Sequence, residues 1–318
     1  MKRLIIVLSI IIAIVPYVAS QIEVFPNENI CDKIKDAFEN EDVVCLMRAN
    51  PLNNWYLLRL HNCDDVVIGQ DQELILPSLV QIQLSGNSDF TLTGNGKITG
   101  EHFQTTQIVI KDDKHDNAVI NMELCNGCRV SDLTIRGDSL GVGSTGIDIG
   151  DNSNNNEMDA VKMQNIKNGM TVSGDNNLFT DLQFFAVAID KNNCDASIND
   201  DSAIRLESSN SNSFTNVLHT RSHGAISFLL QGECDDNTII GLSVEQEESH
   251  CAGGAKDPAV FIDDSMCSGN VFLTNYNGAR TEVDNNIKST ICQNNTILDQ
   301  SSEFANCEGA SLVECPEN

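Results

Sequence analysis

The sequence is short of basic residues. Its 318 residues include 19 Lys and Arg against 46 Asp and Glu, so the formal net charge is −27 at pH 7. Nucleic acids and anionic membrane surfaces would repel such a chain at neutral pH, so we expect neither as a partner. The same balance favours solubility, and we expect most carboxylates to form a solvated outer face.

Long apolar runs are also lacking beyond the first 20 residues. Lys2 and Arg3, the apolar stretch 4–15 and the small residues 18–20 together predict a secretory signal peptide over residues 1–20. The apolar stretch is too short for a comfortable membrane span. We therefore expect an extracellular protein without a membrane segment. Loss of Lys2 and Arg3 would leave 17 basic residues against the same 46 acidic ones.

A second pair of cysteines at zinc-binding spacing is missing. The chain has 12 cysteines, and an even number after a signal peptide predicts up to six disulfides. Only Cys125 and Cys128 have the C-x-x-C spacing, so we expect no metal site and no cofactor.

Helical periodicity is confined to residues 28–40, and short strands recur after it. One strand type occurs at 146–149, 169–172, 203–206, 225–228 and 259–262, and a second type begins at Asn156, Asn177, Asn212, Asn237 and Asn270. Such self-similarity indicates a solenoid, because single units cannot bury their apolar side chains but stacked units can. Alternating apolar residues predict an all-β, right-handed parallel β-helix. Asn tolerates the left-handed conformation at a bend, and its amide can pair with an Asn one turn away.

The ends of the solenoid differ from its middle. Residues 28–40 predict a short N-terminal capping helix with Asn29 as N-cap, held by Cys31, Cys45 and Cys63 in some pairing. We expect one domain, with the β-helix and its cap over 21–300 and a disulfide-tethered tail over 301–318. We expect a monomer.

Stacking also predicts a site. Strands 203–206 and 225–228 are 22 residues apart, and turns stack at ~4.8 Å. Asp200 and Asp201 precede the first strand and His223 precedes the second, so we expect the three side chains to converge. Insertions near 190–198 and 245–257 would form the walls of a groove there, because solenoid insertions gather on one face. Their cysteines, Cys194 and Cys251, would bridge to Cys234, Cys267 or another neighbour.

Several segments resemble the pectin-lyase-like superfamily and, within it, the polygalacturonases. The similar segments are 90–100, 124–135, 144–149, 200–204, 222–227 and 277–281. The resemblance implies a glycoside hydrolase with Asp201 as proton donor and Asp200 as the group that activates water. It also implies that His223 tunes or orients the acid, and that a polysaccharide is the partner, with uronate-containing ones among the candidates. Residues that could hold a substrate carboxylate are Arg205, Arg221 and Arg280.

The sequence also departs from the polygalacturonase pattern. The Asp of the first motif is absent at 144–146, the next turn lacks the paired Asp, and Glu282 stands where the family has a Lys. Three hypotheses therefore stay open: a glycoside hydrolase or polysaccharide lyase, a carbohydrate-binding or adhesive β-helix without catalysis, and a structural surface protein. A shared scaffold does not choose between them.

Overall fold

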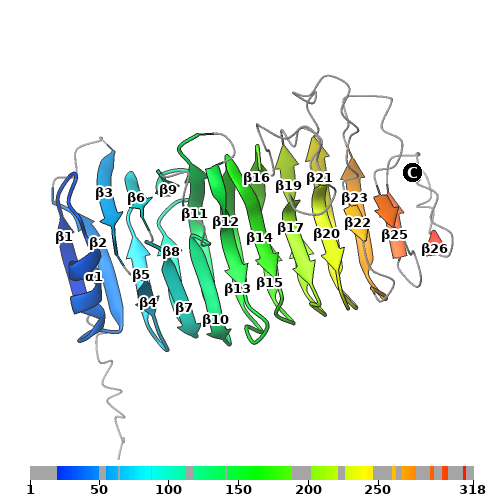
Figure 1. Cartoon of the computed structure of the whole chain (residues 1–318), viewed down its shortest axis with the longest axis horizontal. Helices are drawn as coiled ribbons and strands as arrows, with labels where there is room; N and C mark the ends of the chain where they lie inside the picture. The colour runs from blue at the N-terminus through cyan, green and yellow to red at the C-terminus, as the bar shows by residue number, and fades with distance from the viewer. Residues whose placement is uncertain are drawn as a thin grey trace, which may run out of the picture.

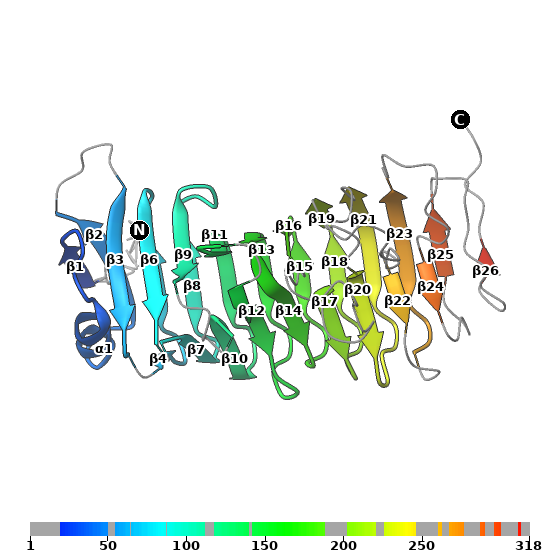
Figure 2. The same ribbon diagram turned by 45° about the horizontal axis from the view of Figure 1, so that its top comes forward.

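The structure is a computed structural model. It describes residues 20–49, 55–63, 65–86, 88–111, 118–139, 142–187, 202–220, 226–245, 260–262, 267–276, 287–289, 296–299 and 311–312. The strands stack side by side along one long axis, from α1 and β1 at one end to β26 at the other (Figure 1). Figure 2 shows the same order in a turned view.

The strands form two sheets. The nine-stranded sheet contains, in spatial order, β4 (Val66–Ile68), β7 (Phe90–Gly94), β10 (Ile120–Cys125), β12 (Val142–Ile149), β14 (Ile166–Val172), β17 (Ser202–Glu207), β20 (Ile226–Gln231), β22 (Val260–Ile262) and β24 (Ile287–Ser289). The 17-stranded sheet contains β1 (Ser20–Val24), β2 (Val43–Arg48), β3 (Tyr56–His61), β5 (Glu73–Leu76), β6 (Val80–Ser85), β8 (Lys97–Gly100), β9 (Thr106–Ile110), β11 (Arg129–Gly137), β13 (Glu157–Gln164), β15 (Leu178–Thr180), β16 (Gln183–Phe185), β18 (Ser213–Thr215), β19 (Leu218–Thr220), β21 (Thr238–Glu245), β23 (Val271–Tyr276), β25 (Thr296–Asp299) and β26 (Ser311–Leu312).

All pairings between the described strands are parallel. In the 17-stranded sheet, β11 pairs with both β8 and β9, and β13 with both β15 and β16. Each of these long strands spans two shorter strands of the neighbouring turn, so the sheet is bent and supplies two walls of the solenoid. The nine-stranded sheet supplies the third wall. The predicted parallel β-solenoid is confirmed.

The register between β17 and β20 corrects the predicted alignment of these strands. Ser202 pairs with Ile226 and Ile204 with Phe228, a separation of 24 residues rather than 22. The observed and predicted offsets differ by an even number of residues, so each side chain stays on its predicted side of the sheet. Ile204, Leu206, Phe228 and Leu230 accordingly all belong to the main core. The side chains beside each other on these two turns are nevertheless not those that the sequence alignment had matched.

Aromatic and aliphatic side chains fill the interior of the solenoid. Phe179 and Phe214 pair in register on β15 and β18, and their rings stack with centroids 4.4 Å apart. Phe228 meets Phe214 edge to face at 5.1 Å. These rings are fully buried, so each turn stabilises the next through apolar contact.

The five asparagines that begin the second strand type form a continuous ladder. Asn156, Asn177, Asn212, Asn237 and Asn270 are all at most 1% exposed. The backbone N–H of each of the first four donates to Oδ1 of the next, at 2.8–2.9 Å. The predicted pairing of asparagines one turn apart is confirmed.

The left-handed backbone positions lie one residue before this ladder. The φ angles are between 56° and 68° at Asn155, Asn176, Ser211, Asp236 and Gly269. Their conformation makes the bend, and the following Asn is then directed inward. The prediction assigned both roles to one residue, whereas the structure divides them between two neighbours.

A short helix covers the N-terminal turn. Helix α1 (Cys31–Phe38) is shorter than the predicted 28–40, and its N-cap is Ile30 rather than Asn29, without a side-chain cap hydrogen bond. Asn29 Oδ1 still accepts a 3.4 Å hydrogen bond from Cys31 N. Ile34 is fully buried and Phe38 is buried too, and a disulfide joins Cys31 to Cys63. Cys45 lies outside that disulfide.

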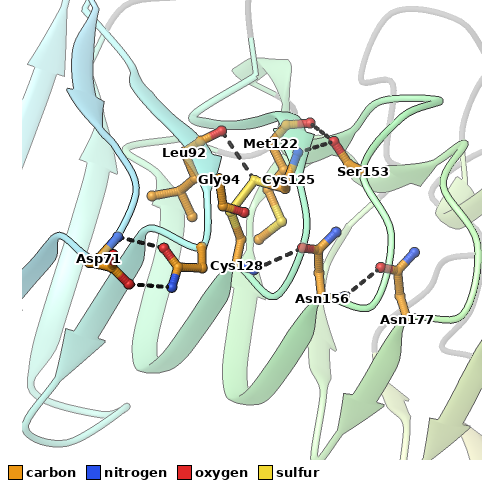
Figure 3. The surroundings of a disulfide bond; sticks show 10 residues. Asp71, Leu92, Gly94, Met122, Cys125, Cys128, Ser153, Asn156 and Asn177 are labelled. Carbon is orange, nitrogen blue, oxygen red and sulfur yellow. Dashed lines mark hydrogen bonds between the residues drawn. A yellow bond between two sulfur atoms is a disulfide. The ribbon is translucent and has the colours of Figure 1, made fainter.

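A second disulfide joins Cys125 to Cys128 at the end of β10 (Figure 3). The backbone N–H groups of these residues donate to Ser153 Oγ at 3.2 Å and to Asn156 Oδ1 at 2.9 Å. The Asn ladder thus starts directly at this disulfide. Two disulfides indicate an oxidising compartment.

Several sequence predictions fall outside the described residues. These are the signal peptide up to residue 19, most of the tail 301–318, and the insertions with Cys194 and Cys251. Within the described residues, Cys234 and Cys267 lie on neighbouring turns, where the Cys267 side chain hydrogen-bonds that of Cys234. No helix among the described residues is long and apolar enough to cross a membrane.

Candidate functional site

A row of polar side chains crosses the outer face of the nine-stranded sheet. Thr91, Asn121 and Asp148 pair in register on β7, β10 and β12. Their flanking residues on each strand are in the core, at 0–1% exposure: Phe90, Leu92, Ile120, Met122, Ile147 and Ile149. Because strand side chains alternate, the polar row is held on the outside by the apolar residues on either side of it.

This row lines a hollow of about 360 Å³, here called the acidic hollow. Four of its eight lining residues carry carboxyl groups and none is basic. The lining consists of Asp65, Asp89, Thr91, Ala118, Asn121, Glu123, Thr145 and Asp148. Asp65 and Asp89 directly precede β4 and β7, so successive turns bring their carboxyl groups to the same edge of the sheet.

Asp89 is the most enclosed carboxyl group of the acidic hollow. It is only 2% exposed, and Asn121 Nδ2 donates a 3.2 Å hydrogen bond to its Oδ2. Its backbone carbonyl also accepts a 3.1 Å hydrogen bond from Val66 N. The position of Asp89 is therefore fixed by both neighbouring turns.

The pKa of Asp148 is shifted from its ordinary value. Although its side chain reaches the surface, partial loss of solvent raises its pKa, and the negative charges of Glu207, Glu123 and Asp151 raise that pKa further. A carboxyl group in this environment keeps its proton to a higher pH than an ordinary Asp. That property suits a group that donates a proton in a reaction.

Arg205, a predicted substrate-binding residue, belongs to the same row. Asp148 pairs with Thr171, and Thr171 pairs with Arg205, so Arg205 lies two turns from Asp148. Its Nε forms a 2.6 Å ion pair with Glu207 Oε1. Glu207 is therefore both the ion-pair partner of Arg205 and a carboxylate whose charge raises the pKa of Asp148.

The other predicted site residues cannot be placed beside this row. Asp200, Asp201, Arg221, His223 and Arg280 lie outside the described residues. Their proposed convergence, and their roles in catalysis and substrate binding, therefore remain predictions.

Sequence reasoning missed Asp89, Glu123 and Asp148 as site residues. A signal for Asp148 was present, because residues 146–149 were identified as a strand of the repeat and the alternation turns Asp148 outward. Identifying its neighbours required the pairing of β10 with β12, which the sequence did not reveal.

The arrangement offers acid–base chemistry. It combines a carboxyl group with a raised pKa and further carboxyl groups on the adjacent turns, the two components that glycoside hydrolysis needs. Among the described residues, no group of three or more His, Cys, Asp or Glu side chains is arranged to hold a metal ion.

A scan against protein-family models gives no match to this chain, and a search of curated proteins gives none either.

Proposed function

We propose that the chain is a secreted glycoside hydrolase that cleaves a polysaccharide in the acidic hollow. Asp148 acts as the general acid and protonates the leaving glycosidic oxygen. Glu123 is an exposed carboxylate on β10 whose charge acts on Asp148. It acts as the general base that takes a proton from the attacking water molecule. The observation that carries this proposal is the raised pKa of Asp148 among neighbouring carboxylates on one face of the solenoid.

The lining of the hollow favours a neutral segment of the polysaccharide at the scissile bond. The lining includes Asp65, Asp89, Glu123 and Asp148 and no Lys or Arg. A uronate bound there would face like charges at short range, which is unfavourable. Sugar hydroxyls can instead donate to the carboxylates and bond with Thr91 and Asn121.

Three further observations support a secreted, polysaccharide-acting protein. The first 20 residues have the pattern of a signal peptide. Two disulfides fit an oxidising compartment. The resemblance of several segments to the pectin-lyase-like superfamily and to polygalacturonases points to glycan substrates.

The test is release of reducing ends from a panel of neutral polysaccharides by the purified chain. Asp148→Asn removes the proton donor but keeps the side-chain shape, so we expect a loss of roughly 100-fold or more in kcat. Asp36→Asn is the matched control, because Asp36 is an exposed residue of α1 outside the hollow. Equal activity of Asp148→Asn and Asp36→Asn would refute the assignment of Asp148.

Glycan binding without hydrolysis is the second candidate function. Thr91 and Asn121 offer hydrogen-bonding groups in the hollow whether or not a bond is cleaved there. Under this alternative, wild type and Asp148→Asn would retain the same glycan from the panel, and neither would release reducing ends.

A further inference from the structure

A second hollow, with the opposite electrostatic character, lies at the N-terminal end of the solenoid. Its volume is about 400 Å³, and it lies where the loop after β1 meets the outer face of β3, β6 and β9. Its lining contains two cations and no carboxyl group: Asn27, Asn29, Arg59, His61, Gln83, Ser85 and Lys111. We call it the basic hollow. It is notable in a chain with a net charge of −27.

Arg59 supplies the main unused charge of the basic hollow. It is exposed on β3 between the fully buried Leu58 and Leu60, so it points outward. Its guanidinium group makes no hydrogen bond or ion pair with any residue that the structure describes. Five N–H donors are therefore available to a ligand in a geometry that matches two oxygens of one anionic group.

Ser85 is oriented as a further donor. Asn62 Nδ2 lies 3.1 Å from His61 Nε2 and donates to it. The proton of the neutral ring is then on Nδ1, which donates to Ser85 Oγ at 2.8 Å. Because Ser85 Oγ already accepts this bond, its own hydroxyl hydrogen is left to point toward a ligand.

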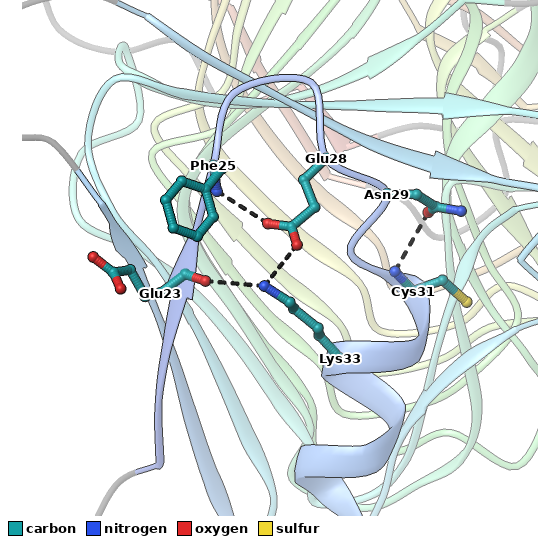
Figure 4. A network of polar contacts seen from close by, with 6 residues as sticks. All are labelled: Glu23, Phe25, Glu28, Asn29, Cys31 and Lys33. Atoms are coloured by element: carbon teal, nitrogen blue, oxygen red, sulfur yellow. Dashed lines mark hydrogen bonds and ion pairs between the residues drawn. The ribbon is translucent and has the colours of Figure 1, made fainter.

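The loop that closes the basic hollow is fixed by its own polar network (Figure 4). Glu28 accepts a 3.0 Å hydrogen bond from Phe25 N and forms a 2.6 Å ion pair with Lys33. Asn29 Oδ1 accepts from Cys31 N, and its Nδ2 donates to the carbonyl of His61 at 3.5 Å. These bonds position the loop before any ligand binds, which reduces the entropic cost of binding.

Lys111, the residue directly after β9, completes the lining. Its Nζ forms a 2.9 Å ion pair with Asp138, which uses one of its three donors. The hollow therefore gathers the full charge of Arg59, the partly compensated charge of Lys111 and the hydroxyl of Ser85.

We propose that the basic hollow binds an anionic group of a glycan, a carboxylate or a sulfate ester, at a distance from the acidic hollow. Anionic oxygens accept several hydrogen bonds at once, and the hollow presents an excess of donors with no competing carboxylate in its lining. Through this site the chain selects glycans that carry acidic groups. The inference does not depend on hydrolysis in the acidic hollow.

Titration calorimetry with matched ligands tests this inference. The probes are tetragalacturonate, the same tetramer with its carboxyl groups methyl-esterified, and a sulfated galactose tetramer. We expect the esterified tetramer to bind at least about tenfold more weakly than tetragalacturonate, because the charge-assisted hydrogen bonds are lost. Tighter binding of the sulfated tetramer than of tetragalacturonate would identify the anionic group as a sulfate ester, and the reverse order as a carboxylate.

Two substitutions localise the effect. Arg59→Gln should weaken binding of the preferred anionic tetramer about tenfold or more and leave the esterified tetramer unchanged. Lys97→Gln removes the same charge from β8, outside both hollows, and should change neither.

The inference is overturned if the esterified and anionic tetramers bind equally, or if Arg59→Gln and Lys97→Gln weaken binding by the same factor. It is also overturned if a short single-stranded oligonucleotide binds as tightly as either anionic tetramer and loses that affinity in Arg59→Gln. That result would assign the hollow to a phosphate polymer instead. Circular dichroism of Arg59→Gln checks that the exposed substitution leaves the fold intact.

Discussion

Asn177 donates a 3.0 Å hydrogen bond from Nδ2 to Oδ1 of Asn212, although the two residues are 35 positions apart in the chain. Oδ1 of Asn212 also accepts the backbone N–H of Asn177 at 2.9 Å. Both residues are 1% exposed. One amide oxygen thus satisfies two buried donors of the preceding turn, where no water can replace it.

Replacing this residue should destabilise the protein strongly. Asn212→Ala leaves two donors of Asn177 without partners and removes the bonds that Asn212 Nδ2 donates to Ser209 Oγ and Asn237 Oδ1. Each buried group left unsatisfied costs about 1–3 kcal/mol, so we expect a loss of roughly 2–5 kcal/mol. The measurement is the free energy of unfolding from urea titration. Asn152→Ala, at an exposed turn residue, is the control and should change it by less than about 0.5 kcal/mol.

The repeat was sufficient to predict the fold, because the Asn positions and the alternating apolar residues reflect a requirement that holds at every turn. Each turn must bury its apolar residues and satisfy the donors at its bend. The register was harder to predict. Turns differ in length between strands, so matching Ala203 with Ala225 gave a 22-residue offset where the structure has 24. Alternation fixes which face a side chain is on, but not which neighbour it meets.

The candidate site shows the same limit. Asp148 could be placed on the outer face from the sequence, but its pKa is raised first by partial loss of solvent and then by the charges of Glu207, Glu123 and Asp151, which come from other turns or from the bend after β12. In a chain with 46 acidic residues, no composition argument distinguishes this Asp. The basic hollow was missed because Arg59, His61 and Lys111 are separated in the sequence and meet only through the pairing of β3, β6 and β9.

The two disulfides should contribute unequally to stability. Cys31 and Cys63 are 32 positions apart and Cys125 and Cys128 only three. Closing the longer loop removes more entropy from the unfolded chain, about 3.7 kcal/mol against roughly 2 kcal/mol. The double variants Cys31→Ala/Cys63→Ala and Cys125→Ala/Cys128→Ala should therefore differ by more than about 1 kcal/mol in urea unfolding. A larger loss from the second pair would contradict this expectation.

His219 should make stability depend on pH. It is fully buried beside Phe184, with Nδ1 2.8 Å from Ser227 Oγ. Burial lowers its pKa from 6.5 to about 4, against a smaller opposing effect of a hydrogen bond with the Val187 backbone. The unfolded chain therefore binds a proton at a higher pH than the folded one does. Neutral His219 therefore contributes to the free energy of unfolding in full above pH 6.5. This contribution, roughly 3 kcal/mol in total, is lost as the pH falls toward 4.

The variant that tests this is His219→Gln, which can still bond to Ser227 but does not titrate. Its free energy of unfolding should fall less than that of wild type between pH 6.5 and pH 4, even if it is less stable at pH 7. Asn152→Ala, at an exposed residue that carries no titratable group, should follow the wild-type pH dependence. Parallel curves for wild type and His219→Gln would show that His219 does not titrate differently in the two states.

Removing a charge near Asp148 should lower the pKa of this carboxyl group. Glu207 is the first of the carboxylates that raise it, and Glu207→Gln also frees Arg205 from its 2.6 Å ion pair. Both changes favour the ionised form of Asp148, so its titration should move to lower pH. Carbon-detected NMR of the Asp148 carboxyl group measures this without any substrate.

If Asp148 is the general acid, the alkaline limb of the pH profile of kcat/KM must move to lower pH by the same interval, because activity requires the protonated form. Glu157→Gln, at a residue paired with Arg129 on the other sheet, should leave both titrations unchanged. A titration of Asp148 that stays in place in Glu207→Gln would show that Glu207 does not raise this pKa, and it would contradict the expectation.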